Sequence, residues 1–192
     1  MHLPHSVLQR AGTRVILGLV AAAALAACAA TRPTCDPVSI AFQPSTRSTT
    51  VRAIKLPLLG LSGYRLTASF SFPGEVPSAP DSVLVAIAGA PAHEQLRGAH
   101  AVRLVLDDGT VLNPGPRYYG MAENHNGYES VAFRLTAPEF RRVAAARNMQ
   151  LQLGQFQLRV RDSTQAALRR VAALTVAGAA MPDERVPACP AS

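Results

Sequence analysis

The densest group of polar and aromatic side chains lies in RYYGMAENHNGYE, residues 117–129. Tyrosine rings offer stacking faces, and carboxylate, amide and imidazole groups offer hydrogen bonds, a combination that suits a ligand-binding loop. The alternative is a β-hairpin that turns at Asn126-Gly127, a strong turn dipeptide, with the polar side chains exposed around it. The candidate ligand-binding residues are Tyr118, Tyr119, Glu123, His125 and Tyr128.

A catalytic or metal site needs more partners than this stretch supplies. Glu123 and His125 could give two ligands to a metal, but no third ligand lies at a useful spacing. His93-Glu94 begins like the helix of a zinc peptidase, but Arg97 stands where that motif needs its second histidine. The chain has neither a P-loop for phosphate nor a Cys-x-x-Cys pair. The sequence therefore predicts no catalytic residues, no metal site and no cofactor.

The first 27 residues have the layout of a secretory signal. Arg10 and Arg14 form a basic start, an apolar run covers residues 15–27, and small residues surround Cys28. The apolar run is too short for a membrane-spanning helix, which needs about 20 residues. We expect residues 1–27 to be removed as a signal peptide.

Leu25-Ala26-Ala27-Cys28, at the end of the apolar run, resembles the lipobox of bacterial lipoprotein precursors. In that family the cysteine sulfur receives a diacylglycerol, signal peptidase II cuts before the cysteine, and the new amino group is usually acylated, commonly with palmitate. The resemblance implies the same for Cys28. The alternative is an ordinary signal peptide, cleaved after Ala27 or Ala30. Since each buried methylene contributes about 0.8 kcal/mol, several acyl chains would hold the protein firmly on a membrane.

The residue after the cysteine bears on the final location. In enterobacterial lipoproteins an aspartate at this place favours retention in the inner membrane, whereas this chain has Ala29. The resemblance therefore implies an anchor in the outer membrane, with the protein facing the periplasm.

Charge bears on the class of partner, and the expected compartment bears on the two remaining cysteines. The chain has 19 basic and 12 acidic residues, a net charge of +7, and loss of the signal peptide would leave +5. Its arginines form no basic block with interleaved aromatic residues, so nucleic acid is not an expected partner. Because the periplasm is oxidising, we expect Cys35 and Cys189 to form a disulfide that ties the C-terminal tail to the start of the domain.

Proline spacing predicts the domain boundaries. Pro33, Pro37 and Pro44 lie among serines and threonines, which predicts a lipidated, extended tether over residues 28–49. A single globular domain is expected over 50–178, followed by a tail over 179–192.

Apolar residues alternate with polar ones through most of the expected domain, a pattern typical of half-buried strands. Asp108-Gly109 separates two apolar runs and predicts a hairpin turn. The expected strands cover 51–56, 64–72, 82–88, two runs within 101–112, and 131–136.

The C-terminal pattern changes to helical spacing. Thr136 and Glu139 predict a capping box for a helix over 138–147, and a hairpin is expected to turn at Gly154-Gln155. Asp162 or Ser163 is the expected cap of a last helix. The fold class is thus mainly β with C-terminal helices (α+β): an antiparallel, sandwich-like domain that ends in helix, hairpin and helix. Residues 131–175 look similar to modules of uncharacterised bacterial envelope proteins, a resemblance that carries no catalytic motif.

Together these features predict a lipid-anchored periplasmic protein without enzymatic activity, which binds or supports another envelope component. The membrane, through Cys28, and an envelope protein are the expected partners. The alternative is a small envelope hydrolase or ligand-binding sensor that uses the loop from Tyr118 to Glu129.

Overall fold

The computed structural model describes residues 37–91, 94–121 and 127–181, all within the unit Asp36–Ser192. Cys28, Cys35 and Cys189 lie outside these ranges, as do Glu123 and His125. The lipidation, the disulfide and two of the five candidate ligand-binding residues therefore stay predictions. Among the described residues, no helix combines the length and the apolarity needed to cross a membrane.

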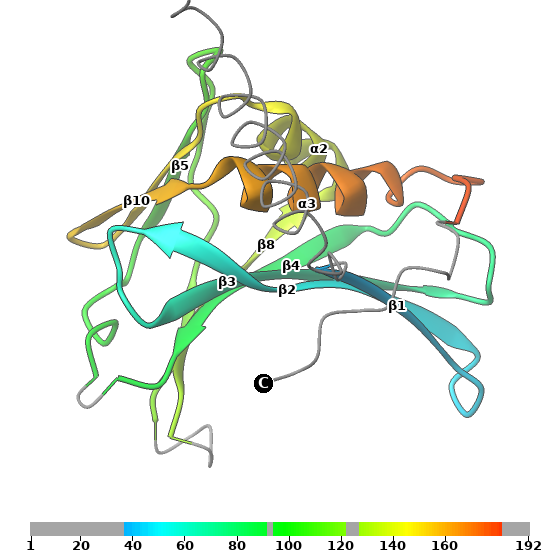
Figure 1. Ribbon diagram of the computed structural model, residues 1–192, viewed down its shortest axis with the longest axis horizontal. Helices are drawn as coiled ribbons and strands as arrows, with labels where there is room; N and C mark the ends of the chain where they lie inside the picture. The colour runs from blue at the N-terminus through cyan, green and yellow to red at the C-terminus, as the bar shows by residue number, and fades with distance from the viewer. Residues whose placement is uncertain (1–36, 92–93, 122–126, 182–192) are drawn as a thin grey trace, which may run out of the picture. The chain divides into compact units, whose positions relative to one another are not determined.

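The described part of the chain is built mainly from β-strands, with two helices near the C-terminal end (Figure 1). A hairpin, β9 and β10, separates the helices, so the predicted α+β class and the order helix, hairpin, helix are confirmed. The elements are β1 (Val38–Gln43), β2 (Ser48–Leu59), β3 (Tyr64–Pro73), β4 (Ser82–Gly89), β5 (Val102–Val105), β6 (Val111–Leu112), β7 (Arg117–Tyr119), β8 (Glu129–Thr136), α2 (Ala137–Ala145), β9 (Gln150–Leu153), β10 (Phe156–Val160) and α3 (Asp162–Ala173).

The strands form one open antiparallel sheet in the order β6-β5-β9-β10-β2-β3-β4-β8-β7, with β1 paired to β2. The long strand β2 joins the two parts of this sheet. Its first residues pair with β1 and β3, whereas Leu58 and Leu59 at its end pair with β10. Between them, at Ile54 and Lys55, the register with β3 shifts, and Lys55 has a φ of 56°. This bulge lets one strand take part in both halves of a strongly bent sheet.

Both helices pack on the same face of the sheet and complete a single core (Figure 1). The predicted alternation in β3 is confirmed, because Tyr64, Leu66, Ala68, Phe70 and Phe72 are buried and the residues between them are more exposed. The helices bury the residues expected from their spacing: Phe140, Val143 and Ala144 from α2, and Leu168, Val171 and Ala172 from α3.

The two helices begin differently. Thr136 and Glu139 form the predicted capping box of α2, with the Thr136 N–H donating to Glu139 Oε2 at 2.8 Å. The predicted cap of α3 is wrong, because Arg161 is the N-cap residue and makes no side-chain cap bond. Instead, the buried Gln165 amide donates to the carbonyl oxygens of Val143, Ala144 and Ala146 at 2.8 to 2.9 Å. The start of α3 is thus fixed against the end of α2, whose last carbonyls it satisfies.

For residues 38–49 the expected tether is wrong, and so is a domain start near Thr50, whereas residues 28–36 lie outside the described ranges. β1 begins at Val38 and pairs with β2 from Ser48 to Ala53. Pro44 lies in the turn between these strands, where its fixed φ is useful, rather than in an extended linker. The domain therefore starts about twelve residues earlier than the proline pattern suggested.

Candidate functional site

The stretch predicted to bind a ligand contains a hairpin. β7 pairs directly with β8, with Tyr118 opposite Val131 and Tyr119 opposite Ser130. Alternation along β7 sends Tyr118 toward the interior and its two neighbours, Arg117 and Tyr119, toward the outer face. The expected ligand-binding tyrosines therefore do not share one site.

On the inner side, Tyr118 contacts a fully buried carboxylate, Glu129, at the start of β8. Four donors surround its two oxygens. The Tyr64 hydroxyl and the Gln95 N–H donate to Oε1, the latter at 2.6 Å. The Leu96 N–H donates to Oε2 at 3.0 Å and the Tyr118 hydroxyl at 3.3 Å. Because Glu129 is saturated by internal donors, it holds β3, β7, β8 and the loop at 95–96 together.

The surroundings keep both tyrosines of this cluster protonated. Burial, together with the hydrogen bond to Glu129 and its negative charge, raises the pKa of Tyr64 far above the ordinary value. Burial also raises the pKa of Tyr118, while Arg97 opposes the shift. Neither hydroxyl is poised to act as a base near neutral pH.

A second carboxylate, Glu94, links two segments beside this cluster. Glu94 Oε1 accepts the Met121 N–H at 2.8 Å, and Glu94 Oε2 lies 2.6 Å from Arg97 Nη2. The hydrogen bond from Met121, followed by the charge of Arg97, lowers the pKa of Glu94. Glu94 and Glu129 thus fix the segment 94–97 in place. Glu94, the acid of the zinc-peptidase-like string, is engaged by Met121 and Arg97.

On the outer side, a short linker forms a seam that connects the two edges of the sheet. The edge strands β6 and β7 are consecutive in the chain and are joined by Asn113-Pro114-Gly115-Pro116. β6 pairs with β5 only at Leu104 and Val105. Continuing this register would place Pro114 opposite Val102, and proline has no N–H to extend the ladder. The β5–β6 ladder therefore ends before this linker.

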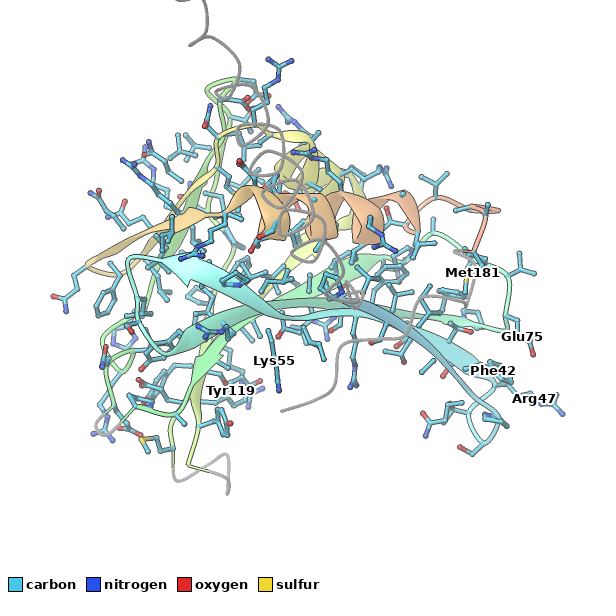
Figure 2. All side chains as sticks on the ribbon, viewed as in Figure 1. Phe42, Arg47, Lys55, Glu75, Tyr119 and Met181 are labelled. Atoms are coloured by element: carbon cyan, nitrogen blue, oxygen red, sulfur yellow. The ribbon has the colours of Figure 1, made fainter. Side chains whose placement is uncertain are left out.

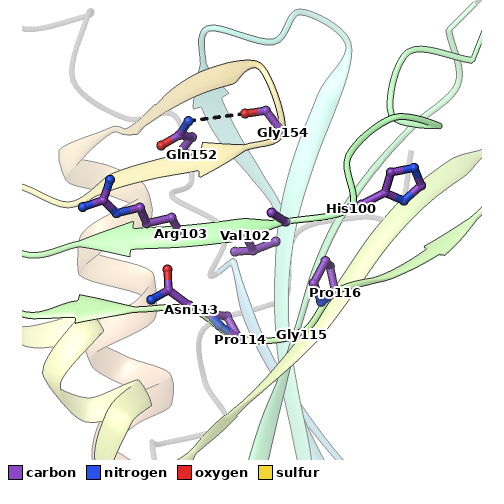
Figure 3. A pocket seen from close by; sticks show the side chains of 10 residues that line it. His100, Val102, Arg103, Asn113, Pro114, Gly115, Pro116, Gln152 and Gly154 are labelled. Atoms are coloured by element: carbon purple, nitrogen blue, oxygen red, sulfur yellow. Dashed lines mark hydrogen bonds between the residues drawn. The ribbon is translucent and has the colours of Figure 1, made fainter.

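Two hollows flank this seam and share Gly115, and we call them together the seam groove. The first, of about 390 Å³, lies between β5, β9 and the segment 113–116 (Figure 3). The second, of about 590 Å³, lies over the outer face of β4, β7 and β8. The polar side chains that line them are His100, Arg103, Asn113 and Gln152 in the first, and Arg117, Tyr119, Ser130 and Arg134 in the second.

The seam groove is positively charged. Among the described residues that line it, three are arginines and none is acidic. Acids on nearby elements are engaged elsewhere: Asp108 pairs with Arg142 at 3.2 Å, and Asp107 accepts the Arg147 N–H at 3.1 Å. Arginine forms paired hydrogen bonds with carboxylates, so this groove suits an anionic group on an extended chain.

Tyr119 is the candidate residue that the structure places in this groove. The guanidinium carbon of Arg117 lies 5.0 Å from the centroid of its ring, within the range of a cation–π contact. Tyr128 is 47% exposed but does not line the groove. Within the described ranges, no group of three or more histidines, cysteines or acids could hold a metal ion.

Sequence reasoning missed Arg103, Arg117 and Arg134 because they come from three strands that only the folded sheet brings to one seam. One sequence feature could have indicated the position of the groove. The two prolines of Asn113-Pro114-Gly115-Pro116 interrupt a run of short strands. Comparison of the chain with protein-family models, with curated proteins and with solved structures finds no match.

Proposed function

We propose that this protein is a lipid-anchored, non-enzymatic binding protein of the cell envelope, which holds an acidic segment of another envelope protein in the seam groove. One observation supports this binding role. Three arginines and no acidic residue are found among the described residues that line the groove. A positive groove attracts an acidic partner during diffusion and fixes its orientation on contact.

The anchor in this proposal rests on Leu25-Ala26-Ala27-Cys28 and its resemblance to a lipobox. With Ala29 after the cysteine, the outer membrane facing the periplasm is the proposed location. A lipidated protein is confined to a surface, which raises its effective concentration toward other envelope proteins. A groove of modest intrinsic affinity is then sufficient.

Two features favour a protein segment over a glycan. Arginine side chains match the planar geometry of carboxylates. In addition, the Tyr119 ring, which lines the groove, lies under the Arg117 guanidinium, so one of its faces is covered.

The anchor is tested by comparing the full chain with Cys28→Ser in cells supplied with labelled palmitate. We expect label and membrane association for the natural chain only. A natural chain that takes up no palmitate and fractionates like Cys28→Ser would overturn the anchor.

The groove is tested in the same cells by placing a photo-crosslinking residue at Asn113, which is exposed in the groove, or at Arg169, which is exposed on α3. We expect an adduct at Asn113 that maps to an acidic segment, weakens at high salt and is lost in Arg103→Ala/Arg117→Ala. An adduct that survives loss of both arginines, or that forms equally at Arg169, would overturn the assigned groove. A glycan adduct would overturn the assigned class of partner.

A further inference from the structure

Exposed apolar side chains gather at the end of the domain formed by the β1–β2 turn. Four of the seven large hydrophobic residues exposed in the described ranges belong to this end: Phe42 (41%), Val76 (71%), Val176 (49%) and Met181 (39%). We call this group the apolar end. Figure 2 shows Phe42 and Met181 there, with Arg47 and Glu75 beside them.

Hydrogen bonds hold the segments of the apolar end together. The Gly74 N–H donates to the Arg47 carbonyl at 2.8 Å, and the Thr49 hydroxyl donates to the Gly74 carbonyl at 2.5 Å. The Gly178 N–H donates to the Pro77 carbonyl at 2.8 Å. The turn at 44–47, the loop around Val76 and the segment 174–181 are therefore fixed relative to one another, and their apolar side chains form one surface.

We propose that the apolar end rests on the membrane surface, with Phe42, Val76, Val176 and Met181 in the headgroup region. This inference rests on the proposed lipid anchor at Cys28. Only nine residues lead from Cys28 to Pro37, so the anchor lies at most about 32 Å from the start of the domain. β1 then runs to the apolar end over six residues, about 20 Å. The bilayer is thus within reach of the apolar end.

A membrane fits this surface better than a second copy of the chain. Specific protein interfaces bury about 1,200 Å² or more, whereas this surface consists of four side chains on loops and a strand end. A tethered domain needs no such area, because the anchor already supplies the bilayer at high effective concentration. Arg47 adds attraction for anionic headgroups, and Glu75 offsets it, so burial of apolar side chains carries the contact.

This placement also orients the seam groove. The apolar end lies at the first residues of β2, whereas the part of the sheet that contains β5 and β9 joins β2 at Leu58 and Leu59. A twelve-residue strand separates these points by up to about 36 Å. With the apolar end on the bilayer, the groove faces away from the lipid, toward partners in the periplasm.

The natural chain has no tryptophan, so a single introduced tryptophan reports its own surroundings. We compare Val76→Trp at the apolar end with the matched control Val111→Trp on β6, which replaces a valine that is 39% exposed. The lipidated full chain is reconstituted in phosphatidylcholine vesicles with brominated acyl chains. Side chains in the headgroup region lie roughly 5–10 Å deep, so we expect at least about twofold stronger quenching for Val76→Trp, with blue-shifted emission.

Flotation of the vesicles separates the possible outcomes. If the protein floats with the vesicles but both tryptophans are equally unquenched, the apolar end does not touch lipid, and only this inference is overturned. If the protein does not float, the anchor fails and the inference falls with it. Emission that shifts with protein concentration, without quenching by bromine, would assign the apolar end to a second copy and would also overturn the inference.

Discussion

The Arg117 guanidinium lies over the ring of Tyr119, with 5.0 Å between its carbon Cζ and the ring centroid. Both residues extend from β7 into the hollow over β4, β7 and β8. An arginine held against a ring has fewer rotamers to lose when it binds a carboxylate, so less of the binding free energy is spent on ordering it. The pair therefore prepares Arg117 for its proposed partner.

Replacing the ring should weaken binding without affecting the fold. In Tyr119→Leu, Arg117 loses its cation–π contact, worth about 0.5–1 kcal/mol at an exposed site, so affinity should fall by about two- to fivefold. A fluorescent oligoglutamate peptide, measured by anisotropy at low salt, provides the readout. Tyr128→Leu, which changes an exposed tyrosine outside the groove, is the matched control. Equal affinities for the two variants would argue against a role for the stacked pair.

The buried carboxylate should dominate the stability of this half of the domain. Glu129→Gln keeps the shape of the side chain but replaces one acceptor oxygen by an amide NH2 group. This donor then faces other donors, either those of Tyr64 and Gln95 or those of Tyr118 and Leu96. The free energy of unfolding should fall by about 2–4 kcal/mol, as judged by urea denaturation. Glu75→Gln makes the same chemical change at an exposed site and should be nearly neutral. If Glu129→Gln left the free energy of unfolding unchanged, the hydrogen bonds to Glu129 would not stabilise the domain.

Alkaline pH should destabilise the protein through Tyr64. Its pKa is raised in the folded state, mainly by burial, while the unfolded chain keeps the ordinary value of about 10. Above pH 10 the unfolded state therefore binds fewer protons than the folded state, and stability falls by up to about 1.4 kcal/mol per pH unit from this group. Below pH 10 the contribution of Tyr64 to the free energy of unfolding does not change with pH. Unfolding free energies between pH 9 and 11 should show this slope in the natural chain and in Tyr128→Phe, but a smaller one in Tyr64→Phe.

The β5–β6 ladder should lengthen when Pro114 is removed. In Pro114→Val a new N–H faces Val102, in register with the pairs Leu104–Leu112 and Val105–Val111. We expect the ladder to extend by two residue pairs, Arg103 with Asn113 and Val102 with residue 114, and the amide of residue 114 to exchange slowly with deuterium. Pro80→Val, in the loop before β4, controls for loss of a proline as such. Rapid exchange at residue 114 would mean that something other than the missing donor ends the β5–β6 ladder at Leu112.

Local patterns predicted local structure well in this chain. Alternation identified β3, β4 and β8, and the capping box of Thr136 and Glu139 marked the start of α2, because these features depend on neighbouring residues alone. The first strand was missed because prolines in a turn and in a linker look alike in sequence.

The site depended on information that a single stretch of sequence does not hold. Tyr118 and Tyr119 were grouped as ligand-binding residues, but their places in a strand send one to Glu129 and the other to the seam groove. The donors around Glu129 come from β3, β7 and the loop at 95–96, and only tertiary structure brings them to one carboxylate.

The shared strand β2 also separates early from late pairing in the folding chain. Its first half pairs with β3, which follows it directly in the sequence, but Leu59 pairs with Arg159, one hundred residues later. As the chain is synthesised from its N-terminus, this edge must stay unpaired until almost the whole domain is available, and such distant pairing is slow. The bulge at Ile54 and Lys55 thus marks the boundary between early and late folding, and a chaperone that shields unpaired strand edges would act on the late side of it.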